Sequence, residues 1–224
     1  MSSDLLPKNE DVTLSSAFIA DVQKRTDVLV LYAFLETLRE IPVRVTEPLM
    51  GEIRMRWWYE AFEEIRDGRT PRYHPLTEAI QRLISHYGLP VQDFLDMVEG
   101  QMPLLDAGPL DVKTALAVVD TGEGRLATLA AFIIDKQQDA SALSDTARFY
   151  GLAQLKRSGR LVDAGGTEGA HLKRQAARAA KGLPPGLMPL GLPAALAEDI
   201  WSGKTAGPLS KRLKLFLAFI TGRI

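Results

Sequence analysis

The sequence contains no cysteine, and its three histidines, His74, His86 and His171, are widely spaced. The absence of cysteine excludes disulfide bonds, thiolate metal sites and cysteine nucleophiles. The histidine spacing provides no pair on one helix face, so the sequence gives no support for a zinc site. No serine stands in a Gly-x-Ser-x-Gly pattern, and the nucleophile motif of serine hydrolases is therefore missing as well.

The sequence also lacks an excess of charge of one sign, since 27 basic and 28 acidic side chains give a formal net charge of −1. Without a basic footprint, no nucleic-acid partner is expected. No run of about 18 apolar residues is present, so no segment is expected to span a membrane. The polar, acidic N-terminus lacks the apolar stretch of a secretory signal, and we expect a cytoplasmic location.

What the sequence does contain is helical periodicity, over a length that can bury a substantial core. It has 224 residues, of which 46% are hydrophobic, and no stretch shows the sustained alternation typical of strands. We therefore predict an all-α fold, with a flexible N-terminal arm over 1–13 and a single domain over 14–224. The first helix is expected to begin between Thr13 and Ser16. Prolines, capping residues and glycines then delimit helices over 48–67, 75–87, 91–105, 111–137, 141–158, 170–181, 194–202 and 208–221.

The clearest helical pattern precedes Pro42. Leu31, Leu35 and Leu38 recur at helical spacing and mark the side of the helix that faces the core. Proline has no N–H to donate and disfavours helical geometry at the residue before it. We therefore expect this helix to end or kink at Ile41.

A polar stripe would adjoin the core side if the helix continued past this proline, comprising Tyr32, Glu36, Arg39 and Val43. Glu36 and Glu40 are four residues apart and therefore lie on one face. Two carboxylates at this spacing can share a divalent cation. Because Arg39 lies beside them, a solvated face with a Glu–Arg contact is the favoured interpretation, and no metal ligand is assigned.

The next helix carries two adjacent tryptophans, Trp57 and Trp58, and an arginine in an unexpected position. On a wheel with about 100° per residue, Arg54 falls in the middle of the apolar arc. A buried guanidinium needs a partner, because an unpaired buried charge is costly. An internal salt bridge is the favoured interpretation. The alternative is a contact with an anion or a lipid head group in a cavity lined by the two tryptophans.

The last predicted helix, 208–221, is basic and amphipathic. Its apolar residues share one face, and cationic side chains flank them. Such a helix either docks on the core, or lies on an anionic membrane surface or a partner protein. The residues assigned to this candidate surface are Lys211, Arg212, Lys214, Phe216 and Phe219.

With these residues in view, the chain resembles the squalene/phytoene synthase family over about residues 15–155. The resemblance rests on short segments in matching order and spacing: Leu31-Tyr32-Ala33-Phe34, Glu47-Pro48-Leu49-Met50-Gly51-Glu52-Ile53-Arg54, Arg56-Trp57-Trp58, Gly68, Pro75, Ala79, Tyr87-Gly88-Leu89-Pro90, Phe94, Gly100 and, more weakly, Tyr150-Gly151-Leu152-Ala153. The chain is most similar to a divergent bacterial branch akin to the mitochondrial complex I assembly factor with this fold. The resemblance implies an isoprenoid synthase-like helical bundle around a central cavity, with a shortened C-terminal part.

The resemblance further implies that active members hold Mg²⁺ with two aspartate-rich motifs on facing helices, and that the metal binds the substrate diphosphates. At the position of the first motif this chain has Arg39, Glu40 and Val43. At the second, Asp163 follows a run rich in lysine and arginine. We therefore expect a non-catalytic protein without a cofactor, in which both metal motifs are lost.

Such a protein would bind an isoprenoid or another lipid, or would act in assembly through a protein partner or through peripheral contact with the inner face of a membrane. The residues expected to line its cavity are Tyr32, Glu36, Arg39, Glu40, Arg54, Trp57 and Trp58. The alternative is an active prenyl transferase that joins two isoprenyl diphosphates and holds Mg²⁺ with Glu36, Glu40 and Asp163. A third interpretation is a lipid carrier without a protein partner.

Overall fold

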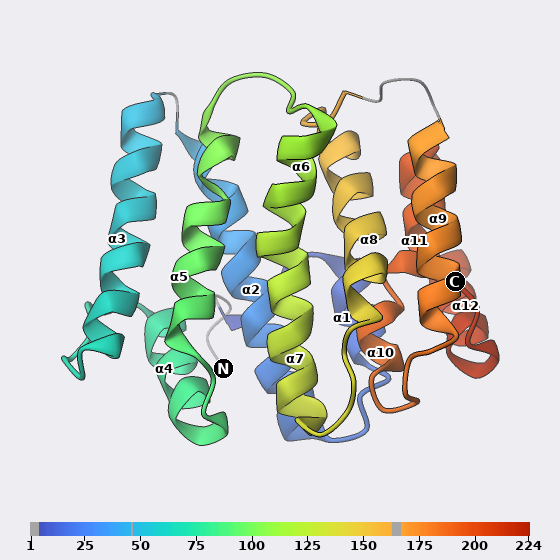
Figure 1. The fold of residues 1–224 in the computed structure, drawn as a ribbon, viewed down its shortest axis with the longest axis horizontal. Coiled ribbons are helices and arrows are strands. Elements are labelled where there is room, and N and C mark those ends of the chain that lie inside the picture. The colour runs from blue at the N-terminus through green and yellow to red at the C-terminus, as the bar shows by residue number, and fades with distance from the viewer. Residues whose placement is uncertain (1–4, 46, 163–166) are drawn as a thin grey trace.

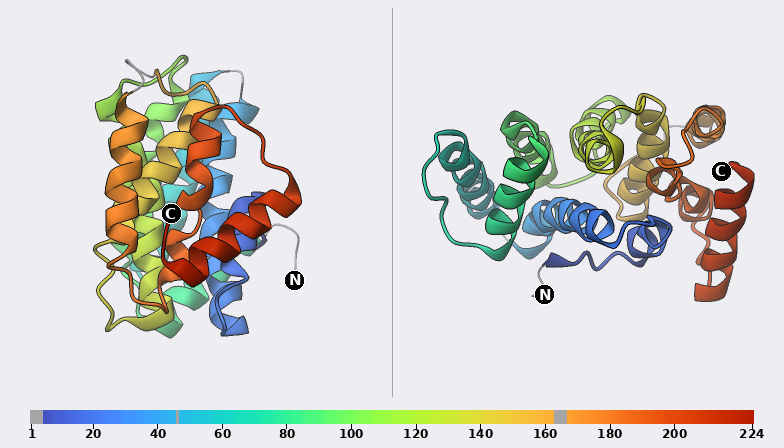
Figure 2. Two further views of the ribbon diagram at one scale, coloured as in Figure 1. Left: turned by 90° about the vertical axis from the view of Figure 1, so that its right-hand side faces the viewer. Right: turned by 90° about the horizontal axis from the view of Figure 1, so that it is seen from below.

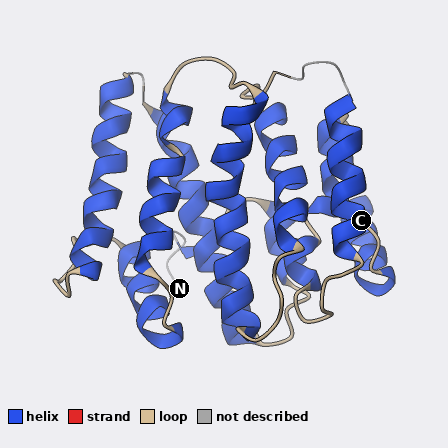
Figure 3. Ribbon diagram, in the orientation of Figure 1, coloured by secondary structure: helices blue, strands red, loops and turns tan. Residues whose placement is uncertain are grey.

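The computed structural model describes residues 5–45, 47–162 and 167–224, and for Thr167 the backbone alone. Within these ranges every regular element is a helix, as Figure 3 shows, apart from an isolated parallel bridge between Leu110 and Leu161. The all-α prediction is therefore confirmed. The elements are α1 (Glu10–Ser16), α2 (Val22–Arg44), α3 (Pro48–Arg66), α4 (Pro75–Tyr87), α5 (Val91–Gly100), the 3₁₀-helix η2 (Met102–Leu105), α6 (Val112–Val119), the π-helical turn η3 (Asp120–Gly124), α7 (Arg125–Asp135), α8 (Leu143–Arg157), α9 (Thr167–Ala180), α10 (Met188–Gly191), α11 (Ala194–Trp201) and α12 (Pro208–Thr221).

The longer helices stand nearly upright and side by side (Figure 1). Near the middle, α6, η3 and α7 follow one another as one uninterrupted helical run. Seen from below, α2 and α1 form a second layer behind this row (Figure 2, right). α2 contacts α3, α4 and α7, whereas α8 contacts η3, α9 and α11. α2 is therefore the central packing partner in one half of the bundle, and α8 is the central packing partner in the other half.

An aromatic cluster joins α2, α3 and α5 in the core. Phe34 lies edge-on to Trp58 and Phe62, with ring centroids 5.4 and 5.2 Å apart. Phe62 in turn stacks on Phe94 at 5.2 Å. Aromatic pairs of this kind contribute about 0.5–1.5 kcal/mol each beyond the area that they bury. Trp58 is thus a core residue, and the cluster fixes α3 beside α2.

The first helix begins earlier than the sequence predicted. α1 starts at Glu10, because the side chain of Asn9 caps it by accepting a hydrogen bond from the Asp11 N–H at 3.0 Å. The expected start between 13 and 16 is therefore wrong. Asp11 and Val12 are buried, so these residues of the predicted arm belong to the packed structure.

The predicted end of helix α2 at Ile41 is also wrong. α2 continues through Pro42 and ends at Arg44. A proline inside a helix removes one i→i−4 hydrogen bond, and here the loss falls in the last turn, where neighbouring bonds are ending in any case. The polar stripe predicted for an uninterrupted helix is therefore continuous as far as Val43.

Other prolines and glycines delimit the helices as predicted. Pro48 and Pro75 occupy the first positions of α3 and α4, where the missing N–H costs nothing. Gly88 closes α4 with φ of 72°, a conformation that residues with a Cβ rarely adopt. Thr46, the predicted cap of α3, lies outside the described residues, and the side chain of Glu47 makes no capping hydrogen bond.

Candidate functional site

A cavity of about 630 Å³ lies between α2, the first turn of α3, η2, η3 and α8, beside the segment that leads into α1. Small-molecule sites in proteins commonly have volumes of roughly 300–1,000 Å³. Its walls are predominantly apolar, with Leu35, Val43, Leu104, Leu105 and Leu155 among the lining residues. The ionisable groups that also line it decide what it can bind.

Arg39 and Glu123 form a two-pronged ion pair in this cavity. Nη1 and Nη2 of Arg39 donate to the two carboxylate oxygens of Glu123, and the distance from Nη2 to Oε2 is 2.6 Å. Nε of Arg39 donates to Oε1 of Gln101 at 3.1 Å, and Gln101 Nε2 donates to the carbonyl of Val118. Because Glu123 is buried, its carboxylate needs the guanidinium of Arg39 as a partner.

Glu36 accepts hydrogen bonds from the chain just before α1. The amide N–H of Lys8 donates to Oε2 at 2.7 Å, and that of Asn9 donates to Oε1 at 2.9 Å. Partial burial raises the pKa of the Glu36 carboxyl above its ordinary value, although the two amides act in the opposite direction. Both oxygens of this carboxylate are thus occupied by donors from the same chain.

Glu40, one turn further along α2, is also paired within the chain. Nζ of Lys8 lies 2.5 Å from Oε1, and Nη2 of Arg44 contacts Oε2. Glu36, Arg39 and Glu40 therefore share one side of α2, as predicted. Glu36 and Glu40 both contact Lys8, whereas Arg39 pairs with Glu123. The predicted Glu–Arg contact within this stripe is replaced by the longer-range pair of Arg39 with Glu123.

Two tyrosines lie in the cavity wall, Tyr150, which is buried, and Tyr32, which is partly buried. Burial raises the pKa of both hydroxyl groups far above the ordinary value, so both stay protonated at neutral pH. Asn9 Nδ2 donates to the Tyr150 hydroxyl at 2.8 Å, and that hydroxyl lies 3.5 Å from Oδ2 of Asp11. These contacts join α8 to the segment around α1.

Arg54 and the two tryptophans do not line this cavity. They border a second, shallower groove of about 250 Å³, to which Glu40 and Arg44 also contribute. Arg54 is exposed and forms no ion pair within the described part of the chain, so the predicted internal salt bridge is wrong. The reason is the rotation of α3, whose buried residues are Gly51, Met55, Trp58, Ala61 and Phe62.

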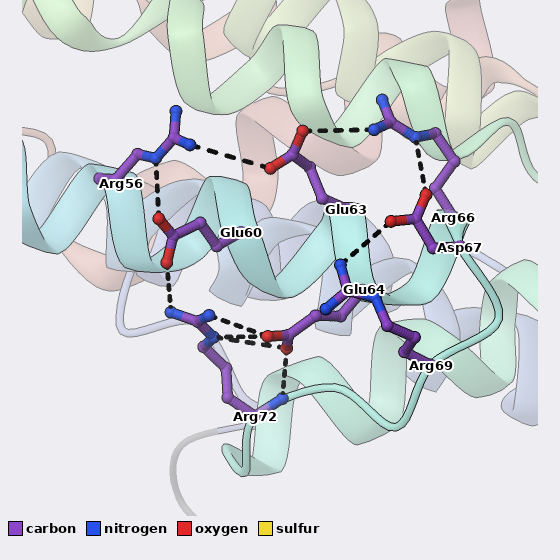
Figure 4. Close-up of polar contacts among 8 residues, drawn as sticks. All are labelled: Arg56, Glu60, Glu63, Glu64, Arg66, Asp67, Arg69 and Arg72. Carbon is purple, nitrogen blue, oxygen red and sulfur yellow. Dashed lines mark hydrogen bonds and ion pairs between the residues drawn. The ribbon is translucent and has the colours of Figure 1, made fainter.

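The acidic side chains in the second half of α3 are engaged in a surface ion-pair network (Figure 4). Arg72 reaches back from the following loop and contacts Glu60 at 2.7 Å and Glu64 at 2.8 Å. Arg56 pairs with Glu60 at 2.9 Å, one turn away on the helix. These hydrogen bonds lower the pKa of the Glu60 and Glu64 carboxyls. The network fixes the loop before α4.

The family resemblance implies Mg²⁺, but the acids described near the cavity do not fit that ion. Glu36 and Glu40 each accept from protein donors, and Arg39 lies between them on the helix. Within the described residues no group of three or more His, Asp or Glu side chains is placed to hold a metal ion. Asp163, the remaining predicted ligand, lies outside those residues.

The residues predicted for a membrane or partner surface lie on different sides of α12. Lys211 donates to Asp11 at 2.7 Å and to Glu10 at 3.3 Å, and Lys214 pairs with Asp199. Both lysines therefore bind α12 to the protein itself. Arg212 and Phe216 are exposed, while the ring of Phe219 lies 4.8 Å from that of Phe18. In the part of the chain that the structure describes, no helix combines the length and the apolarity needed to cross a bilayer.

Sequence reasoning missed Glu123, Lys8, Asn9 and Tyr150 as cavity residues. A signal for Glu123 was present, because it is an acid between two glycines in the middle of an apolar helical stretch. A Cβ on Gly122 would come 3.1 Å from Nη2 of Arg39, so the glycine leaves room for the guanidinium.

With the site described, comparison with protein families gives one match. The family model for squalene/phytoene synthase matches residues 8–156. Because the match covers more than half of the chain, the protein belongs to the squalene/phytoene synthase family. No curated protein matches the sequence. The matched region includes every element that lines the cavity up to Leu155, and ends before α9.

Proposed function

We propose that this protein is a non-catalytic squalene/phytoene synthase-like protein that binds an isoprenoid or another lipid in the cavity beside α2. The observation that carries this proposal is the pairing of the cavity acids. Glu36 and Glu40 accept from Lys8, Asn9 and Arg44, and a guanidinium already neutralises the buried carboxylate of Glu123. No cofactor is part of the proposal.

The charge of the cavity lining favours an uncharged ligand. Ionisable side chains of both signs contribute to it, without the surplus of cations that a diphosphate would require in the absence of a metal ion. The cationic residues are Lys8, Arg39 and Arg160, and the acidic residues are Glu36, Glu40, Asp106 and Glu123. Apolar walls suit a hydrocarbon chain, so we propose an isoprenoid alcohol or a lipid with a neutral head group as the class of ligand.

We further propose that the protein acts in assembly or interaction with a protein partner, in the cytoplasm at the inner face of a membrane. This part of the proposal is supported by the resemblance of the sequence to the assembly-factor branch of the family. It is also supported by the exposed apolar side chains of α12 at one end of the molecule. A ligand in the cavity and a role in assembly are compatible, because a bound lipid can stabilise the conformation that a partner recognises.

The test combines ligand binding with an assay of turnover. Farnesol binding is measured by equilibrium dialysis, and mass spectrometry of the gently purified protein identifies any retained lipid. Val43 is an exposed residue of the cavity lining. Val43→Trp should weaken farnesol binding about tenfold, because the larger side chain would occupy part of the cavity. Val22→Trp is the matched control, since Val22 is an exposed valine of the same helix outside the cavity. Equal binding by both variants, or no binding by the wild-type protein, would contradict the proposal.

The second candidate is an active prenyl transferase. It is favoured by one observation, namely that Glu36 and Glu40 lie on the cavity side of α2. Incubation with farnesyl or geranylgeranyl diphosphate and Mg²⁺ distinguishes the two. Product formation that is abolished by Glu40→Gln would establish the enzyme and overturn the non-catalytic proposal.

A further inference from the structure

The contacts of α12 with the rest of the protein come from its polar side as much as from its apolar side. Leu215 and Ala218 are the buried residues of this helix. Lys211 and Lys214, one turn apart, reach Asp11 and Asp199 on the elements beneath. Asp11 is only 2% exposed, so the ion pair with Lys211 is an internal contact rather than a surface one. These contacts determine which face of α12 points outward.

The outward face of α12 is apolar. On a helical wheel, Leu213 and Ile220 lie opposite Lys211 and Ala218, and both are more than half exposed, at 58% and 57%. Leu209, Phe216 and Leu217 extend this face and are also exposed. Soluble proteins rarely leave several large apolar side chains together in water, because burying each one is worth about 1.5–3 kcal/mol. This face is therefore expected to be covered when the protein works.

The position of α12 makes its outer face accessible to a flat surface. Figure 2 shows that the helix crosses the end of the bundle obliquely, outside α11 and away from α3. The family match ends at residue 156, so α12 lies outside the matched region. The face is also distinct from the cavity, to which no residue of α12 contributes.

The apolar face of α12 could be covered by a lipid surface or by a second copy of the chain, and the charge of this segment favours one of the two. Residues 200–224 contain no acid, and three of their cations, Lys204, Arg212 and Arg223, are exposed. The other two, Lys211 and Lys214, already pair with Asp11 and Asp199. Arg212 is exposed beside the apolar face. Two copies packed through this face would bring like charges together, whereas an anionic bilayer attracts them. Lipid head groups can therefore cover this face without the charge repulsion of a dimer.

We propose that α12 is an interfacial anchor that lies in the plane of an anionic membrane, with Leu209, Leu213, Phe216, Leu217 and Ile220 in the acyl boundary and Arg212 at the head groups. Lys211 and Lys214 keep the helix fixed to the protein in this orientation. The anchor holds the remaining helices at the membrane surface without a spanning segment. This inference rests on the proposed peripheral location but not on the ligand in the cavity.

Vesicle flotation of the full chain tests the anchor. The wild-type protein should float with vesicles of phosphatidylcholine and phosphatidylglycerol, and less with phosphatidylcholine alone. Leu213→Glu should reduce partitioning about tenfold, since it removes an inserted leucine and adds a repelled charge. Arg212→Gln should reduce partitioning about fivefold on anionic vesicles only.

Matched controls separate the anchor from general effects. Ile53→Glu changes an isoleucine that is 54% exposed on α3, at the other end of the bundle, and should float as the wild-type protein does. Val43→Trp should also float normally, because it affects the cavity alone. All variants should retain the wild-type melting temperature, as the altered side chains are exposed. Failure of the wild-type protein to float, or equal loss in Leu213→Glu and Ile53→Glu, would overturn the proposal. A dimer abolished by Leu213→Glu, without vesicle binding, would overturn it in favour of a second copy.

Discussion

Arg39 of α2 and Glu123 of η3 lie 84 residues apart in the sequence and meet through two parallel hydrogen bonds at the cavity. Arg39 occupies a position where the family resemblance implies a metal-binding acid. The buried carboxylate of Glu123 is therefore neutralised by a cation that the chain itself supplies. This internal pairing supports the proposal that the cavity takes an uncharged ligand.

The first prediction concerns this ion pair. Arg39→Met should lower the free energy of unfolding by about 3 kcal/mol, because it leaves the carboxylate of Glu123 buried and unpaired. Glu123→Met should lower the free energy of unfolding by a comparable amount, because it leaves the guanidinium of Arg39 without its partner. The double variant should be less destabilised than the sum of the two, since it leaves no uncompensated charge. Urea denaturation monitored by circular dichroism measures all three.

Strict additivity of the two substitutions would show that Arg39 and Glu123 do not depend on each other. Arg66→Met provides a matched control, because its pair with Glu63 is exposed on the surface of α3. Exposed pairs contribute roughly 0–1 kcal/mol, so this variant should lose little stability.

The second prediction concerns the pH dependence caused by Glu36. Its pKa is raised in the folded protein, so between the unfolded value of about 4.3 and the folded value the native state binds more protons. Stability from this group is therefore greatest below the unfolded pKa and is lost as the pH rises through the folded pKa. Glu36→Gln removes the titration. The wild-type stability minus that of Glu36→Gln should fall over this window and then stay level.

Denaturation at a series of pH values gives the required differences. A glutamine can accept from only one of the two amides of Lys8 and Asn9, and this adds a constant offset to every difference. The slope with pH is therefore the diagnostic quantity. A difference that rises with pH would mean that the hydrogen bonds from the two amides outweigh the effect of burial on Glu36.

Helix boundaries could be predicted from the sequence where the backbone preference of a single residue determines them. They could not be predicted where packing against distant segments determines them. Pro48, Pro75 and Gly88 act through their own backbone preferences, and the helix boundaries that they set are confirmed. Pro42 has the same preferences, but helix α2 tolerates it in the last turn, since only one hydrogen bond is lost there. No local signal distinguishes a proline that ends a helix from one that precedes its end by two residues.

The candidate site could be predicted along one helix but not across the bundle. Tyr32, Glu36, Arg39 and Glu40 share a side of α2 by periodicity alone, and the structure brings all four to the cavity. Their partners come from distant segments, and a single sequence does not give those pairings. The predicted rotation of α3 was also wrong. Ile53 is apolar but exposed, and treating it as a core residue placed its neighbour Arg54 on the side of the helix predicted to be buried.

The third prediction concerns the attachment of α12. Lys211→Ala should increase the hydrogen exchange of α12 amides about tenfold, because Asp11 would stay buried without its cation and the helix would open more often. Arg212→Ala is the matched control, a neighbouring exposed cation that forms no ion pair with the described residues. Exchange of α3 amides should be unchanged in both variants. Equal exchange of α12 in the two variants would show that Leu215 and Ala218 suffice to hold it.

The fourth prediction concerns the close approach of α8 to η3 at Gly151. A Cβ there would lie 2.6 Å from Cγ1 of Val119 and 2.9 Å from Cδ of Glu123, both too short for real contacts. Alanine is preferred to glycine in a helix interior by about 1 kcal/mol, but overpacking a core costs about 1–3 kcal/mol. The steric effect should win, because Glu123 is held by Arg39 and cannot move freely. Gly151→Ala should therefore lower the free energy of unfolding by about 1–2 kcal/mol.

Gly124 provides the matched control for Gly151. It has helical backbone angles, with φ of −63° and ψ of −48°, and a Cβ there would meet only the carbonyl oxygen of Val119, at 3.7 Å. Helix propensity alone then decides, so Gly124→Ala should raise the free energy of unfolding by up to about 1 kcal/mol. Denaturation of both variants gives two effects of opposite sign. If both alanines were stabilising, α8 would be free to move away from Glu123, and the ion pair could not be held as tightly as the described contacts require.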